Sequence, residues 1–262
     1  MERGSSASAE GAAGMDSSSG EREARHHTRR VMHKSEERQA SESQCQHDGS
    51  GVGRYGAAAK KKSIHDSQRE TERVKALREA FTLRLSGEQI QRFRFLDESG
   101  VNLGMTRLYG RAEPGQRVVE STPGYSGAHY TVVATLGIAG VSAPFMFEGA
   151  MNKDIFEMYL EQVLIPDMQP NEVLILDNLS AHKLADLDVR LAEHGIRAIF
   201  LPPYSPDLNP IEKCWSKVKT ALRAAKARTF DALVEAIKLA FASVSFQDAL
   251  HWFAHCGFSC AN

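Results

Sequence analysis

The sequence has no long apolar run. None of its stretches approaches the roughly 18 consecutive apolar residues that a membrane-spanning helix needs. Its first residues, MERGSSASAEGAAG, lack the basic and then apolar order of a secretory signal peptide. We therefore expect no membrane segment and a cytoplasmic location for the chain.

Cysteine is also scarce, and neither sign of charge is in excess. The four cysteines, at positions 45, 214, 256 and 260, include no Cys-x-x-Cys pair, which argues against a disulfide framework. The formal net charge of −1 argues against a uniformly basic surface of the kind that binds nucleic acid. Any contact with DNA must therefore come from a local cluster of basic residues.

Residues 1–70 lack the side chains that build a core. They contain no Leu, Phe or Trp and twelve Ser, so they cannot bury enough apolar surface to offset the entropy cost of ordering. We predict that this segment is disordered and that its five His are solvated rather than arranged as metal ligands. Residues 71–90 are predicted to form a leading helix or linker, and residues 91–262 a single folded domain.

The rest of the chain shows the patterns of a mixed α/β domain. Alternating or apolar runs predict strands at residues 92–96, 107–112, 129–138, 143–147, 172–176 and 197–201, and the first strand is expected to end in a turn at Asp97. Apolar residues at helical spacing predict helices at residues 67–86, 152–168, 182–195, 211–227 and 229–257. This order predicts one mixed sheet, with three antiparallel strands and then parallel strands, flanked by helices.

Two of these helices have a predicted buried face. In the helix at 152–168, Asn152 is the expected N-cap, and Ile155, Tyr159 and Val163 are expected to face the core. In the helix at 211–227, the predicted buried stripe consists of Ile211, Trp215, Val218 and Leu222. Glu212 then lies on the neighbouring flank of that helix, where it can lean over the edge of the sheet.

Three acidic residues lie where predicted strands end or helices begin. Asp97 follows RFRFL, Asp177 follows EVLIL, and Glu212 follows LPPYSPDLNPI. A carboxylate at the tip of a buried strand is destabilised by desolvation unless a cation compensates its charge. Hard divalent cations prefer such oxygen ligands, and a pair of them can drive phosphoryl transfer. If the strand before Asp177 pairs in parallel with the first strand, both aspartates emerge at the same edge of the sheet.

Each of these residues also has an ordinary structural explanation. Asp97 and Asp177 begin sequences that are typical of turns. Asn209, Pro210 and Glu212 match a capping box, in which Glu212 would serve the end of its own helix. The spacing alone leaves the carboxylate site and these explanations open.

The C-terminal region raises a similar question about zinc. Its potential ligands are His251, His255, Cys256 and Cys260. The aromatic residues between them, Trp252, Phe253 and Phe258, favour a helix that packs on the core.

Three motifs carry a resemblance to a known family. They are LDESGVNLGMTRLYGRA, ILDNLSAHK and LPPYSPDLNPIEKCWSKVK. Through them, residues from about 92 to 258 resemble the catalytic domain of bacterial insertion-sequence transposases of the mariner-like DDE superfamily, which have a ribonuclease-H-like fold. Thirty-four residues separate Asp177 from Glu212, which is the gap this superfamily shows between its second Asp and its final acidic residue.

The resemblance implies a transposase that cleaves DNA at the ends of its element and joins the freed 3′-hydroxyl to target DNA. Asp97, Asp177 and Glu212 would be its catalytic triad and would bind two Mg²⁺ ions, for which Mn²⁺ can substitute. As a hypothesis, Asp97 bridges both ions, Asp177 shares one and Glu212 completes the other. The same resemblance implies a DNA partner, a homodimer or larger assembly on DNA, and association with the nucleoid.

Other residues are candidates for supporting this site. Asn178, His182 and Asn209 are near it in the motifs, although His182 is also interpretable as a histidine that simply begins a helix. Candidate DNA contacts come from the basic stretch after Glu212 and from the residue after His182; they are Lys183, Lys213, Lys217, Lys219 and Arg223. The alternative for the basic stretch is a solvated helix face.

The N-terminal segment departs from the family. Full-length relatives carry a helix-turn-helix region that recognises the inverted repeats, and residues 1–70 lack the core residues that such a region needs. We therefore keep two alternatives to a complete transposase. One is a catalytically silent, DNA-associated remnant, and the other is a ribonuclease-H-like nuclease that does not transfer strands.

Overall fold

The computed structural model describes residues 66–124 and 127–258. The predicted disordered segment therefore lies outside the described residues, except for residues 66–70. Those residues are ordered, because Asp66 caps a short 3₁₀ helix, η1 (Ser67–Glu70), by accepting a hydrogen bond from the backbone of Gln68. Residues 66–70 therefore do not fit the predicted disordered segment.

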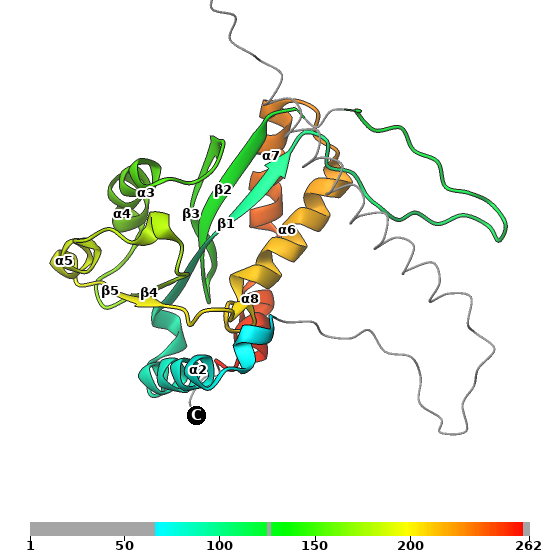
Figure 1. The fold of residues 1–262 in the computed structure, drawn as a ribbon. Coiled ribbons are helices and arrows are strands. Elements are labelled where there is room, and N and C mark those ends of the chain that lie inside the picture. The colour runs from blue at the N-terminus through cyan, green and yellow to red at the C-terminus, as the bar shows by residue number, and fades with distance from the viewer. Residues whose placement is uncertain (1–65, 125–126, 259–262) are drawn as a thin grey trace, which may run out of the picture. The chain divides into compact units, whose positions relative to one another are not determined.

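The domain contains one five-stranded mixed sheet with the strand order β3-β2-β1-β4-β5 (Figure 1). Its strands are β1 (Phe93–Asn102), β2 (His129–Gly137), β3 (Gly140–Glu148), β4 (Val173–Leu176) and β5 (Arg197–Phe200). The first three are antiparallel neighbours, whereas β4 pairs in parallel with β1 and β5 in parallel with β4. This is the predicted topology, with β1 at the centre.

Helices cover both faces of the sheet. One layer comprises α6 (Ile211–Ala225), α7 (Phe230–Ala242) and α8 (Phe246–His255). The other comprises α3 (Lys153–Tyr159), the π-helical turn η3 (Leu160–Leu164), α4 (Ile165–Asp167) and α5 (Leu187–Glu193). The remaining elements are α2 (Glu72–Leu85) and the 3₁₀ turns η2 (Ile90–Arg92), η4 (Ser180–His182) and η5 (Pro206–Leu208).

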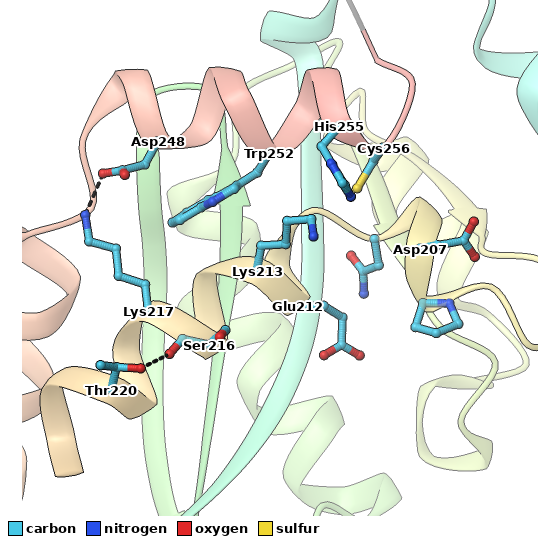
Figure 2. A pocket seen from close by; sticks show the side chains of 12 residues that line it. Asp207, Glu212, Lys213, Ser216, Lys217, Thr220, Asp248, Trp252, His255 and Cys256 are labelled. Atoms are coloured by element: carbon cyan, nitrogen blue, oxygen red, sulfur yellow. Dashed lines mark hydrogen bonds and ion pairs between the residues drawn. The ribbon is translucent and has the colours of Figure 1, made fainter. Parts of the chain in front are cut away.

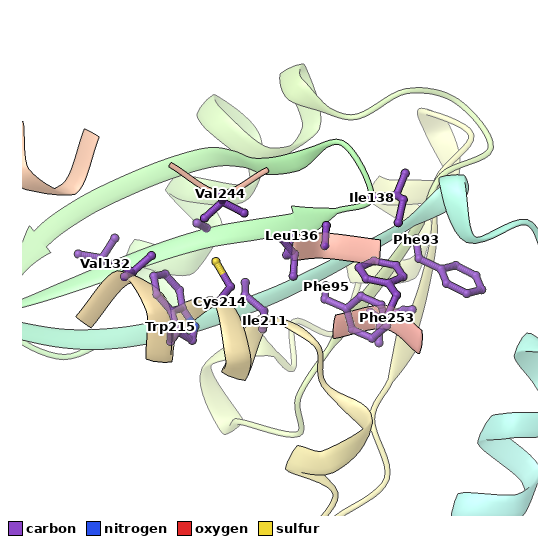
Figure 3. Packing of buried hydrophobic residues seen from close by; sticks show 14 of the residues in the cluster. Phe93, Phe95, Val132, Leu136, Ile138, Ile211, Cys214, Trp215, Val244 and Phe253 are labelled. Carbon is purple, nitrogen blue, oxygen red and sulfur yellow. The ribbon is translucent and has the colours of Figure 1, made fainter. Parts of the chain in front are cut away.

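The alternation of side chains in β1 divides the core into two clusters. Phe93 and Phe95 point to the side covered by α6 and α8, where Phe95 packs edge-on against Phe253 at 5.3 Å between ring centroids (Figure 3). Leu96 points to the opposite side and packs with residues of α3 such as Phe156. All four residues of β4 are buried, because helices cover both faces of this central strand.

Two predicted features of the strands are wrong. β1 does not end at Asp97 but continues to Asn102, because residues 97–102 pair with β2. Residues 107–112 form no strand and belong to a long excursion between β1 and β2 that extends away from the sheet (Figure 1). Arg228 anchors the start of that excursion by donating hydrogen bonds to the carbonyl oxygens of Leu103 and Met105 at 2.7 and 3.0 Å.

Several helix predictions also need correction. Asn152 caps α3 as expected, but the fully buried residues of this region are Phe156, Tyr159, Leu160 and Leu164. Tyr159 is buried as predicted, whereas Ile155 and Val163 are only partly buried. The helix predicted at 182–195 begins only at Leu187. The region at 229–257 is two helices, since Ser245 and Asp248 form a capping box that begins α8.

Within residues 66–124 and 127–258, no helix combines the length and apolar character needed to cross a membrane.

Candidate active site

Asp97 and Asp177 lie level with each other on adjacent parallel strands. β1 and β4 pair in register from Phe93 with Val173 to Phe95 with Ile175. Asp97 and Asp177 are each two residues beyond the last of these pairs. Ligands of parallel sheets bind beyond the carboxyl ends of the strands, where Asp177 follows β4, and Asp97 lies beside it on β1. The predicted juxtaposition of the two residues therefore holds, although Asp97 lies inside its strand rather than at the end of it.

Glu212 reaches the same place from the first turn of α6. The buried face of α6 includes the whole predicted stripe and Cys214, which leaves Glu212 exposed on the flank. The capping box is not formed, because Pro210 is the N-cap and no side chain caps the helix. Asp97, Asp177 and Glu212 all line one cavity of about 340 Å³, so the three carboxylates converge on the same space.

Burial and neighbouring carboxylates both act on Asp97. Burial raises the pKa of Asp97 to about 7, and the negative charges of Glu212, Glu98 and Asp177 add to the shift. A hydrogen bond from the backbone N–H of Glu98 offsets part of this shift. The indole Nε1 of Trp215 also donates a hydrogen bond to Asp97 Oδ2 at 3.2 Å. Without a cation, Asp97 therefore holds its proton up to about neutral pH.

His182 lies behind Asp177 and is completely buried. Its Nε2 is 2.9 Å from Glu98 Oε1, and its Nδ1 is 2.9 Å from Asp177 Oδ1, off the line of an ideal hydrogen bond. The ring of Phe156 packs against the imidazole at 4.6 Å between centroids. Burial disfavours the charged imidazole, but the contacts with Asp177 and Glu98 outweigh it and raise the pKa of His182 to about 9. His182 therefore holds the side chain of Asp177 from behind.

The two predicted asparagines both lie at the cavity. Asn178 lines it, and its Nδ2 donates a hydrogen bond to the carbonyl oxygen of Leu201. Asn209 is also part of the lining, and its buried Oδ1 has no hydrogen-bond partner among the described residues. An unpaired amide oxygen beside three carboxylates is suited to a cation or to a donor that enters from the cavity.

The predicted basic residues divide into two groups. Lys217 is engaged, because its Nζ is 2.6 Å from Asp248 Oδ2 and 2.8 Å from the carbonyl oxygen of Ser243. The other four, Lys183, Lys213, Lys219 and Arg223, form no ion pair or side-chain hydrogen bond with the described part of the chain. These four cations are thus available to an external anion, and Lys213 is nearest in sequence to the carboxylates.

The sequence does not indicate two further residues that lie at the site, Glu98 and Trp215. Glu98 is part of a turn-like Asp-Glu-Ser-Gly sequence and is recognisable only through its contact with His182. Trp215 has the pattern of a core residue, and it is buried as such, yet its one polar atom reaches Asp97. Its position three residues after Glu212 on the same helix is the available signal.

The donor set suits a hard divalent cation. Carboxylate and amide oxygens are the ligands that Mg²⁺ and Mn²⁺ prefer, and the mutual repulsion around Asp97 is the charge that such a cation relieves. No three His, Cys, Asp or Glu side chains of the described residues already form a metal cluster. Asp97, Asp177 and Glu212 fit in chemistry and location, and their side chains would draw together around an ion.

The C-terminal residues that could bind zinc do not come together as ligands in the described part of the chain. His251, His255 and Cys256 are within the described residues and form no such cluster, and Cys260 lies outside the described residues. Phe253 and Phe258 both contact Phe95, as the packing interpretation predicts.

Comparisons with known proteins agree with this fold. The family model described as "DDE superfamily endonuclease" matches residues 92–234. The search of curated proteins returned no match. Among solved structures, a pre-cleavage Mos1 transpososome aligns with a TM-score of 0.61 and 16% identity, over 83% of this chain and 67% of that one. The catalytic domain of Mos1 mariner transposase aligns with a TM-score of 0.54 and 13% identity, over 75% and 92%.

A further Mos1 structure, a paired end complex with Mg, aligns with a TM-score of 0.59 and 16% identity, over 77% of this chain and 65% of that one. The chain thus spans about two thirds of the longer Mos1 chains that it matches. At these identities the likeness establishes the ribonuclease-H-like fold that the motifs imply.

Proposed function

Since the chain belongs to the DDE superfamily of endonucleases, we propose that it is a transposase that cleaves DNA at element ends and transfers the freed strand to target DNA. The observation that carries the proposal is the convergence of Asp97, Asp177 and Glu212 on one cavity from three separate segments. An ordinary turn or helix cap explains any one of these carboxylates, but it does not explain why all three line the same cavity.

Asp97, Asp177 and Glu212 would hold two Mg²⁺ ions, which when bound activate the attacking oxygen and stabilise the leaving oxygen of the phosphodiester. The chain's own contribution is position and charge. Asp97 is held by Trp215, and Asp177 is held by His182, so both carboxylates face the cavity before substrate arrives. Asn209 adds a neutral oxygen at the same cavity. No side chain needs to form a covalent intermediate with DNA.

DNA is the proposed partner, and the free cations of α6 are its proposed contacts. Lys213, Lys219 and Arg223 follow Glu212 along this helix, so a phosphate backbone that enters the cavity can continue over them. Joining two element ends requires two active sites, which favours a homodimer or larger assembly on DNA. Such a function places the protein with DNA in the cell, at the nucleoid of a bacterium.

Nicking of supercoiled plasmid in the presence and absence of Mg²⁺ or Mn²⁺ tests the proposal. We expect metal-dependent nicking by the parent chain and none by Asp177→Asn, which preserves the shape of the side chain but removes its charge. Asp188→Asn is the matched control, since Asp188 is exposed on α5 away from the cavity lining. Full metal-dependent nicking by Asp177→Asn would overturn the assignment.

A strand-transfer assay with a labelled oligonucleotide that has a free 3′-hydroxyl separates the alternatives. Joined product supports the transposase. Nicking without joined product supports the nuclease alternative, and DNA binding with neither activity supports the silent remnant.

A further inference from the structure

A second hollow adjoins the carboxylate cavity. It has a volume of about 680 Å³, within the range of cavities that hold small ligands. We name it the α6–α8 groove, because its lining comes mainly from α6 (Glu212, Lys213, Ser216, Lys217, Thr220) and α8 (Asp248, Trp252, His255), with Cys256 at the end of α8 (Figure 2). Pro206, Asn209 and Glu212 line both hollows, so the groove begins where the cavity ends.

Apart from Glu212, which it shares with the carboxylate cavity, the unpaired charge of the groove is positive. Its acidic residues other than Glu212 are already paired: Asp207 with Arg69 and Arg78, and Asp248 with Lys217. Lys213 has no acidic partner among the described residues, and its ammonium group extends into the groove (Figure 2). The hydroxyl of Ser216 lines the same floor one helical turn further along. The groove therefore offers a cation and a hydroxyl to an anionic backbone.

Trp252 gives the groove an aromatic wall. Its indole extends from α8 towards α6 between Asp248 and His255 (Figure 2), and it is half-buried. In the described part of the chain no other aromatic ring stacks on Trp252, unlike Trp215, which packs against Phe241. A half-buried indole that lines the groove beside an unpaired lysine matches the two elements of single-strand recognition, stacking on a base and contact with a phosphate.

We propose that the α6–α8 groove binds a few nucleotides of single-stranded DNA that continue from the phosphate held at the carboxylate cavity. Trp252 stacks on an unpaired base, and Lys213 and Ser216 contact the backbone. The inference rests on the proposed function for the direction of the strand, because the groove and the cavity share Glu212 and Asn209. Stacking requires a base with an exposed face, so a blunt duplex should bind less well in the groove.

Binding of a fluorescein-labelled 12-nucleotide oligothymidylate, measured by anisotropy in EDTA, tests the proposal. We expect Trp252→Leu to weaken binding by about 10-fold or more. Lys213→Gln should lower the slope of log affinity against log salt by about 0.7, the loss of one phosphate contact on a single strand. A blunt duplex of the same length should respond less to Trp252→Leu than the single strand does.

Matched controls come from exposed residues outside the groove. Phe246→Leu changes an exposed aromatic residue of the same helix, and Lys238→Gln changes a lysine of α7 that pairs with Glu235. Both should bind the oligonucleotide as the parent chain does. If Trp252→Leu impairs folding, as judged by thermal unfolding, the surface variant Lys213→Gln and the quenching of Trp252 fluorescence by oligonucleotide still decide the question.

Parent-like affinity in Trp252→Leu and an unchanged salt slope in Lys213→Gln would overturn the proposal. Plasmid nicking by the same preparations separates this outcome from a failure of the proposed function. Nicking with groove-independent oligonucleotide binding refutes the groove alone. Groove-dependent binding without nicking refutes the catalytic function and leaves the binding site in place.

Discussion

His182 Nδ1 lies 2.9 Å from Asp177 Oδ1, and the other nitrogen of the same buried ring contacts Glu98. Groups behind a metal ligand fix its orientation, and their loss typically costs about 10- to 100-fold in metal affinity or activity. We therefore expect His182→Leu to lower metal-dependent nicking by about that factor. The measurement is the nicking rate as a function of Mn²⁺ concentration.

A second variant separates positioning from stability. His182→Leu leaves the nearly buried Glu98 carboxylate without its partner, which should cost about 1–3 kcal/mol of unfolding free energy. Adding Glu98→Gln removes that charge and should recover part of the stability without recovering nicking. Recovery of both together would mean that His182 acts only through the fold.

Trp215→Phe tests the hydrogen bond to Asp97. The substitution retains an aromatic ring in the core and removes the Nε1 donor 3.2 Å from Asp97 Oδ2. We expect nicking to fall by about 10-fold, measured at saturating Mg²⁺ and at limiting Mg²⁺. Phe253→Leu is the packing control, because Phe253 is fully buried on the same face and contacts no carboxylate. Equal losses of nicking per folded molecule in both variants would contradict a specific role for the indole.

The sequence predicts the parts of the site that depend on local pattern. The apolar run before Asp177 indicates a strand buried on both faces, and β4 is one. The apolar spacing after Pro210 predicts which flank of α6 carries Glu212. The motifs then predict that these two residues and Asp97 act together, and all three line one cavity.

The features of the site that the sequence does not predict depend on contacts between segments that are distant in the chain. Local sequence suggests that Asp97 ends its strand, because Ser99 and Gly100 are typical turn residues, but pairing with β2 extends β1 through them. Asn209 matches an N-cap, yet tertiary packing buries it one position before the N-cap. Glu98 meets His182 across 84 positions, and no local pattern can indicate such a pair.

The segment before α6 is held by a long-range ion pair that offers a third test. Arg78 binds Asp207 in a bidentate manner at 2.8 and 3.1 Å, and Arg69 contacts the same carboxylate at 3.0 Å. Burial disfavours ionisation of Asp207, but the two arginines outweigh it and hold its pKa below the usual range. Asp207 lies in η5, between the cavity-lining residues Pro206 and Asn209.

Arg78→Gln should increase the mobility of this segment while lowering the unfolding free energy of the domain only slightly. Exposed ion pairs contribute little, so we expect a loss of about 1 kcal/mol or less in unfolding free energy. Hydrogen exchange of the amides at residues 204–209 should accelerate, and nicking should fall several-fold. Arg73→Gln, an exposed arginine on the same helix, is the control. Unchanged exchange in Arg78→Gln would show that the proline-rich segment holds its conformation without the ion pair.

The pKa of Asp97 predicts how the stability of the metal-free protein depends on pH. Folding raises this pKa from 3.8 to about 7, so the folded state binds the proton more tightly than the unfolded chain. The resulting stabilisation is present below pH 4 and is lost as the pH rises towards 7, by up to about 4 kcal/mol. Asp97→Asn is neutral throughout and lacks this loss. In EDTA, its melting temperature should therefore exceed that of the parent chain by an amount that grows from pH 5 to pH 8.

Comparing the parent chain with Asp97→Asn in the presence of Mg²⁺ also tests whether Asp97 binds the cation. Because a divalent cation compensates the charge that Asp97→Asn removes, adding Mg²⁺ at pH 8 should raise the melting temperature of the parent chain and leave that of Asp97→Asn nearly unchanged. Asp188→Asn should behave as the parent in both respects, since Asp188 lies on the exposed face of α5. Parallel pH profiles for the parent and Asp97→Asn would contradict the buried, repelled state of this carboxylate. If Asp97 destabilises the metal-free protein and added cation removes that effect, then its role in this fold is to bind the cation.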